Sequence, residues 1–138
     1  MFKHTVEYND FNGSERKEDL YFHLSLPEVT RLEAEIGKSL EDHIKELTNN
    51  QETSELLAFL ERIMLSSYGK KTLDGKSFHK SKEAREAFEY SQAYAELFEQ
   101  IITQPGLAQK FGEHVSNTGQ AKKNQITPKV VTSEPTQG

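Results

Sequence analysis

A chain of 138 residues has room for one domain of ordinary size and not for two comfortable domains with a linker. Its formal net charge of -5 and its pI of about 5.6 disfavour nucleic acid and anionic membranes as partners, because both carry negative charge. The chain has no cysteine, which excludes disulfides and thiolate nucleophiles, and no apolar run approaches the roughly 20 residues of a membrane span.

Residues 1–25 predict a β-hairpin. Apolar or aromatic residues alternate with polar ones in "FKHTVEY" and "DLYFHLS", as in strands that bury one face. Asn12-Gly13 lies between these segments and is a strong signal for a tight turn, because both residues tolerate positive φ. His4 and His23 are expected to face each other across the two strands. A lone hairpin is marginally stable in water, so this one should pack on helices or pair with another chain.

Helices are expected over residues 26–68. Ser25 and Glu28 have the spacing of a capping box at the start of the first helix. The apolar residues of this helix, Val29, Leu32 and Ile36, are expected on one face. Gly37 can take the left-handed conformation that ends a helix, and Ser39 can cap a short second helix. These signals predict two short, separate helices before residue 50.

A third helix should run from about residue 50 to Tyr68. Asn49 and Glu52 are its candidate caps, and Gly69 is expected to end it. The helix carries the most regular apolar stripe in the chain, so it is the expected central helix of the core. The stripe consists of Leu56, Leu57, Leu60, Ile63, Met64 and Ser67.

The segment "GKKTLDGKSFHKS" resembles a phosphate-binding loop at first sight. The two glycines of such a loop are separated by four residues, and the loop joins a strand to a helix, whereas here five residues intervene and a helix precedes. We therefore predict a turn at Asp74-Gly75 inside a second small hairpin over residues 69–80. Its lysines form a potential basic docking edge on an acidic chain, although solvated side chains are the ordinary alternative. They are Lys70, Lys71, Lys76 and Lys80.

Helices are again expected over residues 81–115. Ser81 can cap the first, and Ser91 either continues that helix or starts another. The next helix has Tyr90, Tyr94, Leu97, Phe98 and Ile101 on one side, and the last begins at Pro105. Most of these apolar residues fit a core, but such a terminal helix pair can also offer an apolar groove to another helical protein. The residues predicted for partner contact are Tyr94, Phe98, Leu107, Phe111 and Val115.

Residues 116–138 are polar and rich in Thr, Gln, Gly and Pro, and we expect them to form a flexible tail. Residues 1–115 are then one domain. The predicted fold class is mainly α with a small N-terminal β-hairpin.

No motif of the chain indicates catalysis, a metal or a cofactor. There is no Gly-x-Ser-x-Gly nucleophile elbow, and the serines are mostly placed to cap helices. The five histidines include no pair at the three- or four-residue spacing of metal ligands on a helix. We therefore expect a protein that is not an enzyme and that works by binding other proteins.

Two parts of the chain resemble the small tail assembly chaperones of bacteriophages with long, non-contractile tails. The first is "VEYNDFNGSERKEDLYFHLSLPEVTRLE", with its "DFNG" turn and "ERKEDLYFHL" strand. The second covers residues 60–115 and contains the "SYG" helix end, the "DGKSFHKS" turn and the "AREAF" and "SQAYAELFEQI" helices. None of these motifs is catalytic, so the resemblance carries over segments of the fold and no active site.

The resemblance implies a non-enzymatic role in the cytoplasm of the bacterial host. Such a protein binds the long, helical, aggregation-prone tape measure protein while tail tube subunits polymerise, and leaves before the virion matures. Further partners would be the major tail protein and a longer form of the chain made by ribosomal frameshifting, for which Lys122-Lys123 is the candidate site. A second copy of the chain is also a candidate partner, because the edges of the hairpin can pair between subunits. The alternative is a minor tail or connector protein that stays in the virion.

Overall fold

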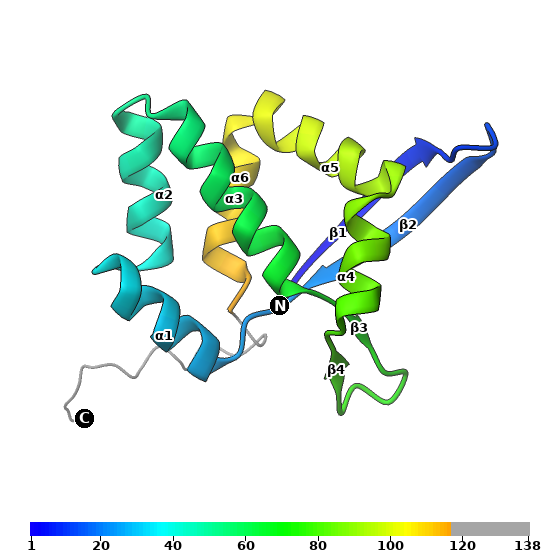
Figure 1. Cartoon of the computed structure of the whole chain (residues 1–138), viewed down its shortest axis with the longest axis horizontal. Helices are drawn as coiled ribbons and strands as arrows, with labels where there is room; N and C mark the ends of the chain where they lie inside the picture. Colours follow the sequence, from blue (N-terminus) through cyan, green and yellow to red (C-terminus); the bar gives the residue numbers. More distant parts are fainter. Residues whose placement is uncertain (117–138) are drawn as a thin grey trace.

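The computed structural model describes residues 1–116, which form a mainly helical protein with an N-terminal β-hairpin, as predicted (Figure 1). The predicted flexible tail, apart from Ser116, lies outside the described residues. The strands are β1 (Phe2–Asn9), β2 (Glu15–Phe22), β3 (Tyr68–Lys71) and β4 (Phe78–His79). The helices are α1 (Leu26–Ile36), α2 (Leu40–Asn49), α3 (Thr53–Ser67), α4 (Lys82–Glu89), α5 (Gln92–Thr103) and α6 (Pro105–His114).

Strands β1 and β2 form the predicted antiparallel hairpin, with Phe2 opposite Phe22 at its base. Gly13 has a φ of 84° in the turn, and the Asp10 carboxylate accepts hydrogen bonds from backbone N–H groups of the same turn. The predicted pairing of His4 with His23 is wrong. His4 lies opposite Leu20, and His23 follows the last residue of β2, because the turn sets the register of the strands.

The second small hairpin is also confirmed, and it extends the first into a four-stranded sheet of order β1-β2-β3-β4. Phe22 and Tyr21 of β2 lie opposite the first two residues of β3, and Lys70 of β3 lies opposite His79 of β4. The pairing of β2 with β3 was not predicted from the sequence. A local pattern shows that a strand exists, but it does not show which distant strand will pair with it.

Gly69 does not end the third helix, so that prediction is wrong. Helix α3 ends at Ser67, and β3 begins at the next residue. A Cβ atom at Gly69 would lie 2.6 Å from Cε2 of Phe78 and 2.7 Å from the carbonyl oxygen of His79. Glycine is therefore needed here for the close approach of two strands rather than for a helix cap.

Serine caps separate most of the helices. Ser25 and Glu28 form the predicted capping box, and Ser39 caps α2. Ser91 caps a new helix, α5, which settles the alternative left open for residues 81–103. Asn49 does not cap α3 but is the last residue of α2. Glu52 stands at the N-cap of α3 without a side-chain hydrogen bond.

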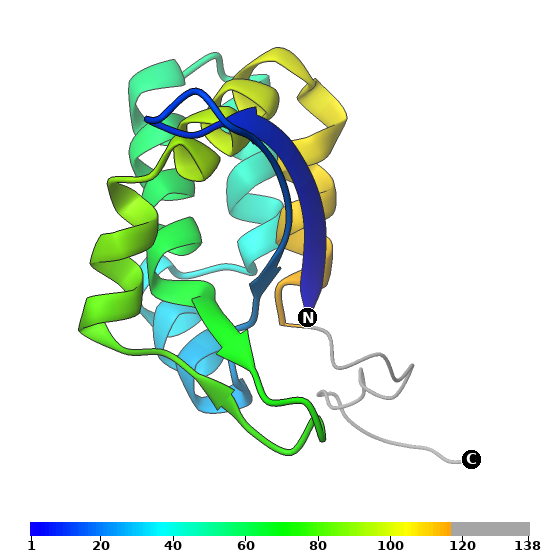
Figure 2. The ribbon, with the colours of Figure 1, turned by 90° about the vertical axis from the view of Figure 1, so that its right-hand side faces the viewer.

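The helices gather on one face of the hairpin, as Figure 2 shows. Phe22 lies at the centre of the core, where its ring centroid is 5.5 Å from that of Phe111 and 5.8 Å from those of Tyr68 and Phe88. Burial of such rings gives the core much of its stability, at about 1.5–3 kcal/mol for each fully buried apolar side chain. Within residues 1–116 no helix is both long and apolar enough to cross a membrane.

Candidate functional site

The five residues predicted for partner contact lie in or against the core. They are Tyr94 and Phe98 on α5, Leu107 and Phe111 on α6, and Val115 directly after α6. Only Phe98 is partly rather than fully buried. The Tyr94 hydroxyl donates a hydrogen bond of 2.9 Å to Glu61 on α3. Burial, and then this carboxylate, raise the pKa of Tyr94 well above its usual value. A partner reaches the four buried side chains only when α5 or α6 leaves its place on the hairpin.

Helix α6 is seated closely against the rest of the molecule. A Cβ atom at Gly112 would lie 2.7 Å from Cδ1 of Ile44 on α2. At the end of α6, the carbonyl oxygen of Val115 accepts a hydrogen bond of 2.9 Å from the backbone N–H of Leu24. The ring of Phe111 stands edge-on to that of Phe2 at 5.3 Å. These contacts make α6 part of the core rather than a displayed surface.

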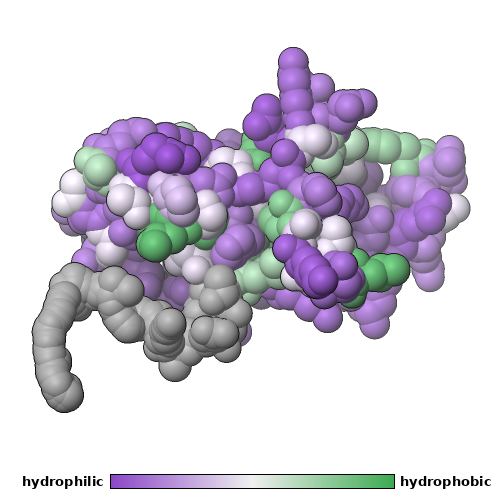
Figure 3. Space-filling view, turned by 90° about the horizontal axis from the view of Figure 1, so that it is seen from below, coloured by the Kyte–Doolittle hydropathy of each residue, from purple (hydrophilic) through white to green (hydrophobic). Residues whose placement is uncertain are grey.

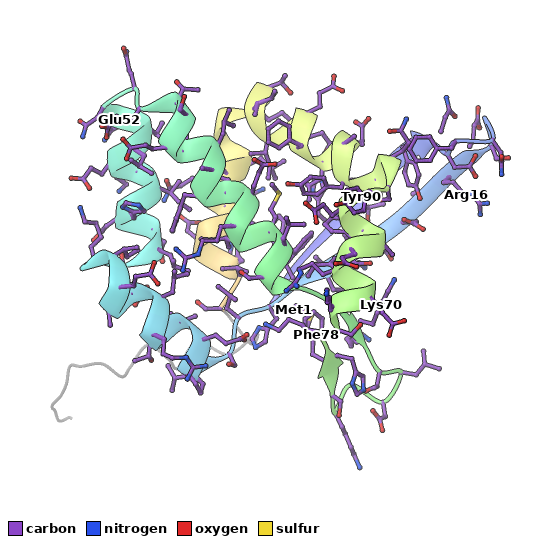
Figure 4. All side chains as sticks on the ribbon, viewed as in Figure 1. Met1, Arg16, Glu52, Lys70, Phe78 and Tyr90 are labelled. Atoms are coloured by element: carbon purple, nitrogen blue, oxygen red, sulfur yellow. The ribbon has the colours of Figure 1, made fainter. Side chains whose placement is uncertain are left out.

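The predicted basic edge lies on the β3–β4 hairpin, where Figure 4 labels Lys70 and Phe78. The side chains of Lys70, Lys71 and Lys76 are exposed. The Lys70 ammonium lies 5.5 Å from the ring centroid of Tyr68, and that of Lys71 lies 5.6 Å from the ring centroid of Tyr21. Both lysines are therefore held along the sheet by cation–π contacts while their charges remain open to a partner.

The turn that resembles a phosphate loop is a hydrogen-bonded β-turn, as predicted. Gly75 has a φ of 76°. The Asp74 carboxylate accepts hydrogen bonds of 2.7 Å from the Thr72 hydroxyl and 3.0 Å from the backbone N–H of Lys76. The N–H group that a phosphate would need is thus already bonded to a negative side chain.

Helix α1 carries apolar side chains that the core covers only in part. It has no fully buried residue, and Leu26 at its start is 74% exposed. Val29, Leu32 and Ile36 continue the stripe at helical spacing and are only partly buried against the edge of the core. The predicted stripe is therefore present. Leu26 at its start is open to solvent, and Val29, Leu32 and Ile36 are partly covered by the core.

Polar contacts hold α1 to the rest of the molecule. Arg62 on α3 donates hydrogen bonds of 2.7 and 2.9 Å to the two carboxylate oxygens of Glu35. Lys80, at the end of the basic edge, lies 2.7 Å from Glu28 and donates to the carbonyl oxygen of His23. Burial alone would raise the pKa of Glu28, but the hydrogen bonds from Lys80 and from the backbone of Ser25 lower it overall. Such partly exposed ion pairs contribute little stability and are easily exchanged for others.

Other exposed apolar side chains are scattered. They are Phe11, Leu73, Tyr90 and Ile102, with exposed fractions of 52% or more. Tyr90 belongs to this set, although the helical spacing placed it with Tyr94, because it lies in the junction before α5 (Figure 4). Figure 3 shows the underside as a largely hydrophilic surface with separate apolar patches.

A hollow of about 590 Å³ lies between the outer half of the hairpin and α5. Its wall contains the carboxylates of Glu7, Glu15, Glu96 and Glu99, and its one basic residue, Arg16, forms an ion pair of 2.8 Å with Asp10. Burial, and then the Glu18 carboxylate, raise the pKa of Tyr8 in this wall to about 12. The hollow is thus strongly acidic. Within residues 1–116 no group of three or more His, Asp or Glu side chains is arranged to hold a metal ion.

The stripe of Val29, Leu32 and Ile36 was predicted from the sequence, but the exposure of Leu26 at its start was not. Its apolar residues have the same spacing as those of a buried helix, so spacing alone did not separate the two cases. The acidic side chains that flank these apolar residues were the sequence feature that could have indicated their exposure. Glu28, Glu33 and Glu35 flank the stripe closely, and each carboxylate accepts a hydrogen bond from outside α1 or from its cap.

One of three comparisons with known proteins agrees with the family resemblance seen in the sequence. A family model described as "Phage tail assembly chaperone" matches residues 1–116, which are all the residues that the structure describes. The searches of curated proteins and of solved structures found no match.

Proposed function

The chain belongs to the phage tail assembly chaperone family, and from that membership we propose that it binds the tape measure protein of its phage during tail assembly. The family implies a non-enzymatic role. In this proposal the protein acts in the cytoplasm of the host cell, keeps its client soluble while the tail tube forms, and is absent from the mature virion.

The exposed stripe of α1 is the observation that supports this proposal best. The resemblance implies a long helical client, and two helices associate by packing apolar stripes against each other. Leu26 is exposed and Val29 and Leu32 are partly exposed, so a partner can reach this stripe without unfolding the core. The binding surface of the proposal is therefore α1, with its stripe of Leu26, Val29, Leu32 and Ile36.

The ion pairs around α1 fit a partner that must later be released. Glu28 and Glu35 bind Lys80 and Arg62 in the free protein. A charged client can exchange these partners at small cost, because exposed ion pairs contribute about 0–1 kcal/mol each. Lys70, Lys71 and Lys76 on the adjoining basic edge would then meet acidic side chains of the client. Several weak contacts together give useful affinity and still permit displacement.

The buried residues have a different part in the proposal. Tyr94, Phe98, Leu107, Phe111 and Val115 would contact the client only if α5 and α6 opened, which costs the burial of the ring cluster around Phe22. We propose that these residues support the binding surface from inside, and that α1 makes the first contact.

Co-expression tests client binding. The tape measure protein of the same phage is produced with and without this chain, and the soluble fraction and co-purification are measured. We expect the client to become soluble and to co-purify. A client that stays insoluble and unbound in the presence of folded chaperone would contradict the proposal.

Mass spectrometry of purified virions separates the proposal from its alternative. A chaperone that leaves before maturation is missing from the virion, although it is present in lysates of infected cells. Detection at a stoichiometric copy number would instead support the minor tail or connector protein that remains in the particle.

A further inference from the structure

Strand β1 is an open edge of the sheet. In the order β1-β2-β3-β4 it has one neighbour, β2, and it is eight residues long. Within the described residues, no backbone hydrogen bond outside the β1–β2 ladder reaches Phe2–Asn9. Figure 2 shows β1 crossing the front of the molecule with no other element drawn over it. An uncovered edge of this length is a template for another strand.

The solvent face of β1 carries charges that are symmetric about its middle. Lys3, Thr5 and Glu7 are exposed and stand on the same face at two-residue steps. If a second copy of β1 lies antiparallel with Thr5 opposite its own counterpart, Lys3 of each chain faces Glu7 of the other. Opposite charges in directly facing positions stabilise a strand pair by about 0.2–1 kcal/mol each.

Neighbouring registers do not share this complementarity. A two-fold axis at Lys3 sets the two Lys3 side chains against each other, and an axis at Glu7 does the same with the two carboxylates. An axis at His4 sets Lys3 opposite Thr5, and an axis at Val6 sets Lys3 opposite Asn9 and Glu7 opposite Thr5. Within each chain, Lys3 already lies 3.7 Å from Asp19, and Glu7 lies opposite Lys17. The register centred on Thr5 is the one in which Lys3 and Glu7 both also face an opposite charge of the second chain, whereas like charges disfavour the registers centred on Lys3 and on Glu7.

We propose that two copies of the chain form a two-fold dimer by antiparallel pairing of their β1 strands about Thr5. This arrangement joins the two sheets into one and covers the open edge of each. A two-fold interface uses the same surface on both chains and closes on itself, so it does not lead to open filaments. The inference is independent of the client and of α1.

Charge exchange tests the register in the full chain. The mass in solution is measured by light scattering after gel filtration, and the expected value is twice 15.8 kDa. Lys3→Glu and Glu7→Lys each place like charges together twice and should raise the dimer dissociation constant about tenfold. The double variant restores opposite charges and should restore the dimer. Lys45→Glu makes the same charge change at an exposed position of α2, away from the hairpin, and should leave the dimer intact.

A cysteine at the centre tests the geometry directly. The chain has no other cysteine, so Thr5→Cys gives a single thiol per molecule. Directly opposite Cβ atoms on paired strands are about 4.5–5.5 Å apart, close to the separation that a disulfide needs. Mild oxidation should link Thr5→Cys chains and leave an Asp19→Cys control, one strand further from the axis, unlinked.

Three results would overturn the inference. They are a wild-type chain that is monomeric at high concentration, a double variant no better than either single variant, and equal cross-linking of the two cysteine variants. Circular dichroism of every variant shows whether the hairpin and helices are intact, so that loss of the dimer is not confused with loss of the fold.

Discussion

Helices α1 and α6 make an instructive pair. They are 11 and 10 residues long, and each carries apolar residues at helical spacing with a proline in its first turn. Yet Leu107 and Phe111 of α6, and Val115 directly after it, are buried, whereas α1 has no buried residue and exposes Leu26. Residues at the same helical spacing are thus buried in the core in α6, whereas in α1 they lie at the edge of the core. The difference lies in what the rest of the fold packs against each stripe.

The largest expected effect is at Phe111. Its replacement by alanine removes the ring contacts with Phe2 and Phe22, so we expect the free energy of unfolding to fall by about 3–5 kcal/mol. Leu32→Ala on α1 should cost no more than about 2 kcal/mol, because Leu32 is only partly buried. Urea denaturation followed by circular dichroism measures both. Equal losses in the free energy of unfolding would contradict the difference in burial between α6 and α1.

Two glycines of α6 test how closely the helix is seated. Gly112→Ala brings a methyl group to 2.7 Å from Cδ1 of Ile44, whereas a methyl group at Gly106 meets nothing within 4 Å. Alanine favours the helix at both positions, so the difference between the variants isolates the clash with α2. We expect Gly112→Ala to be less stable than Gly106→Ala by about 1–3 kcal/mol. Thermal melting curves of the two proteins give this comparison, and equal stabilities would show a looser α6.

The ion pair of Glu28 with Lys80 should have a smaller, pH-dependent effect. The pKa of Glu28 is lowered in the folded protein, so its contribution is present above its unfolded value of 4.5 and is lost as the pH falls through the folded value. Because both side chains are partly exposed, the contribution should stay below about 1 kcal/mol. Denaturation of wild type and Glu28→Gln at pH 7 and pH 3 tests this. The free energies of unfolding of the two proteins should differ at pH 7 and become equal at pH 3. A difference that stays constant would show that the charge of Glu28 does not cause it.

The local elements could be predicted well from the sequence because their signals are local. Asn12-Gly13 marked the turn of the first hairpin, and Ser25 and Ser39 marked the starts of two helices. Gly69 was misread because glycine ends helices and also permits close strand contacts, and only the position of Phe78 distinguishes the two.

The candidate site was harder to predict because exposure is a property of the whole fold. The residues predicted for partner contact lie at helical spacing, but most of them are buried in the folded protein. The open stripe of α1 and the open edge of β1 appear only when the neighbours of each element are known. A chain that binds other proteins has no catalytic motif to mark its surface, so the prediction of its site depends on tertiary structure.

The most direct measurement compares two exposed leucines in a capture assay. Leu26 on α1 is 74% exposed and Leu73 in the β3–β4 turn is fully exposed, so neither Leu26→Ser nor Leu73→Ser should lower the melting temperature appreciably. Co-purification of the tape measure protein is then measured for both variants and for wild type. We predict a clear loss of capture for Leu26→Ser and wild-type capture for Leu73→Ser. Undiminished capture by a folded Leu26→Ser variant would contradict α1 as the binding surface.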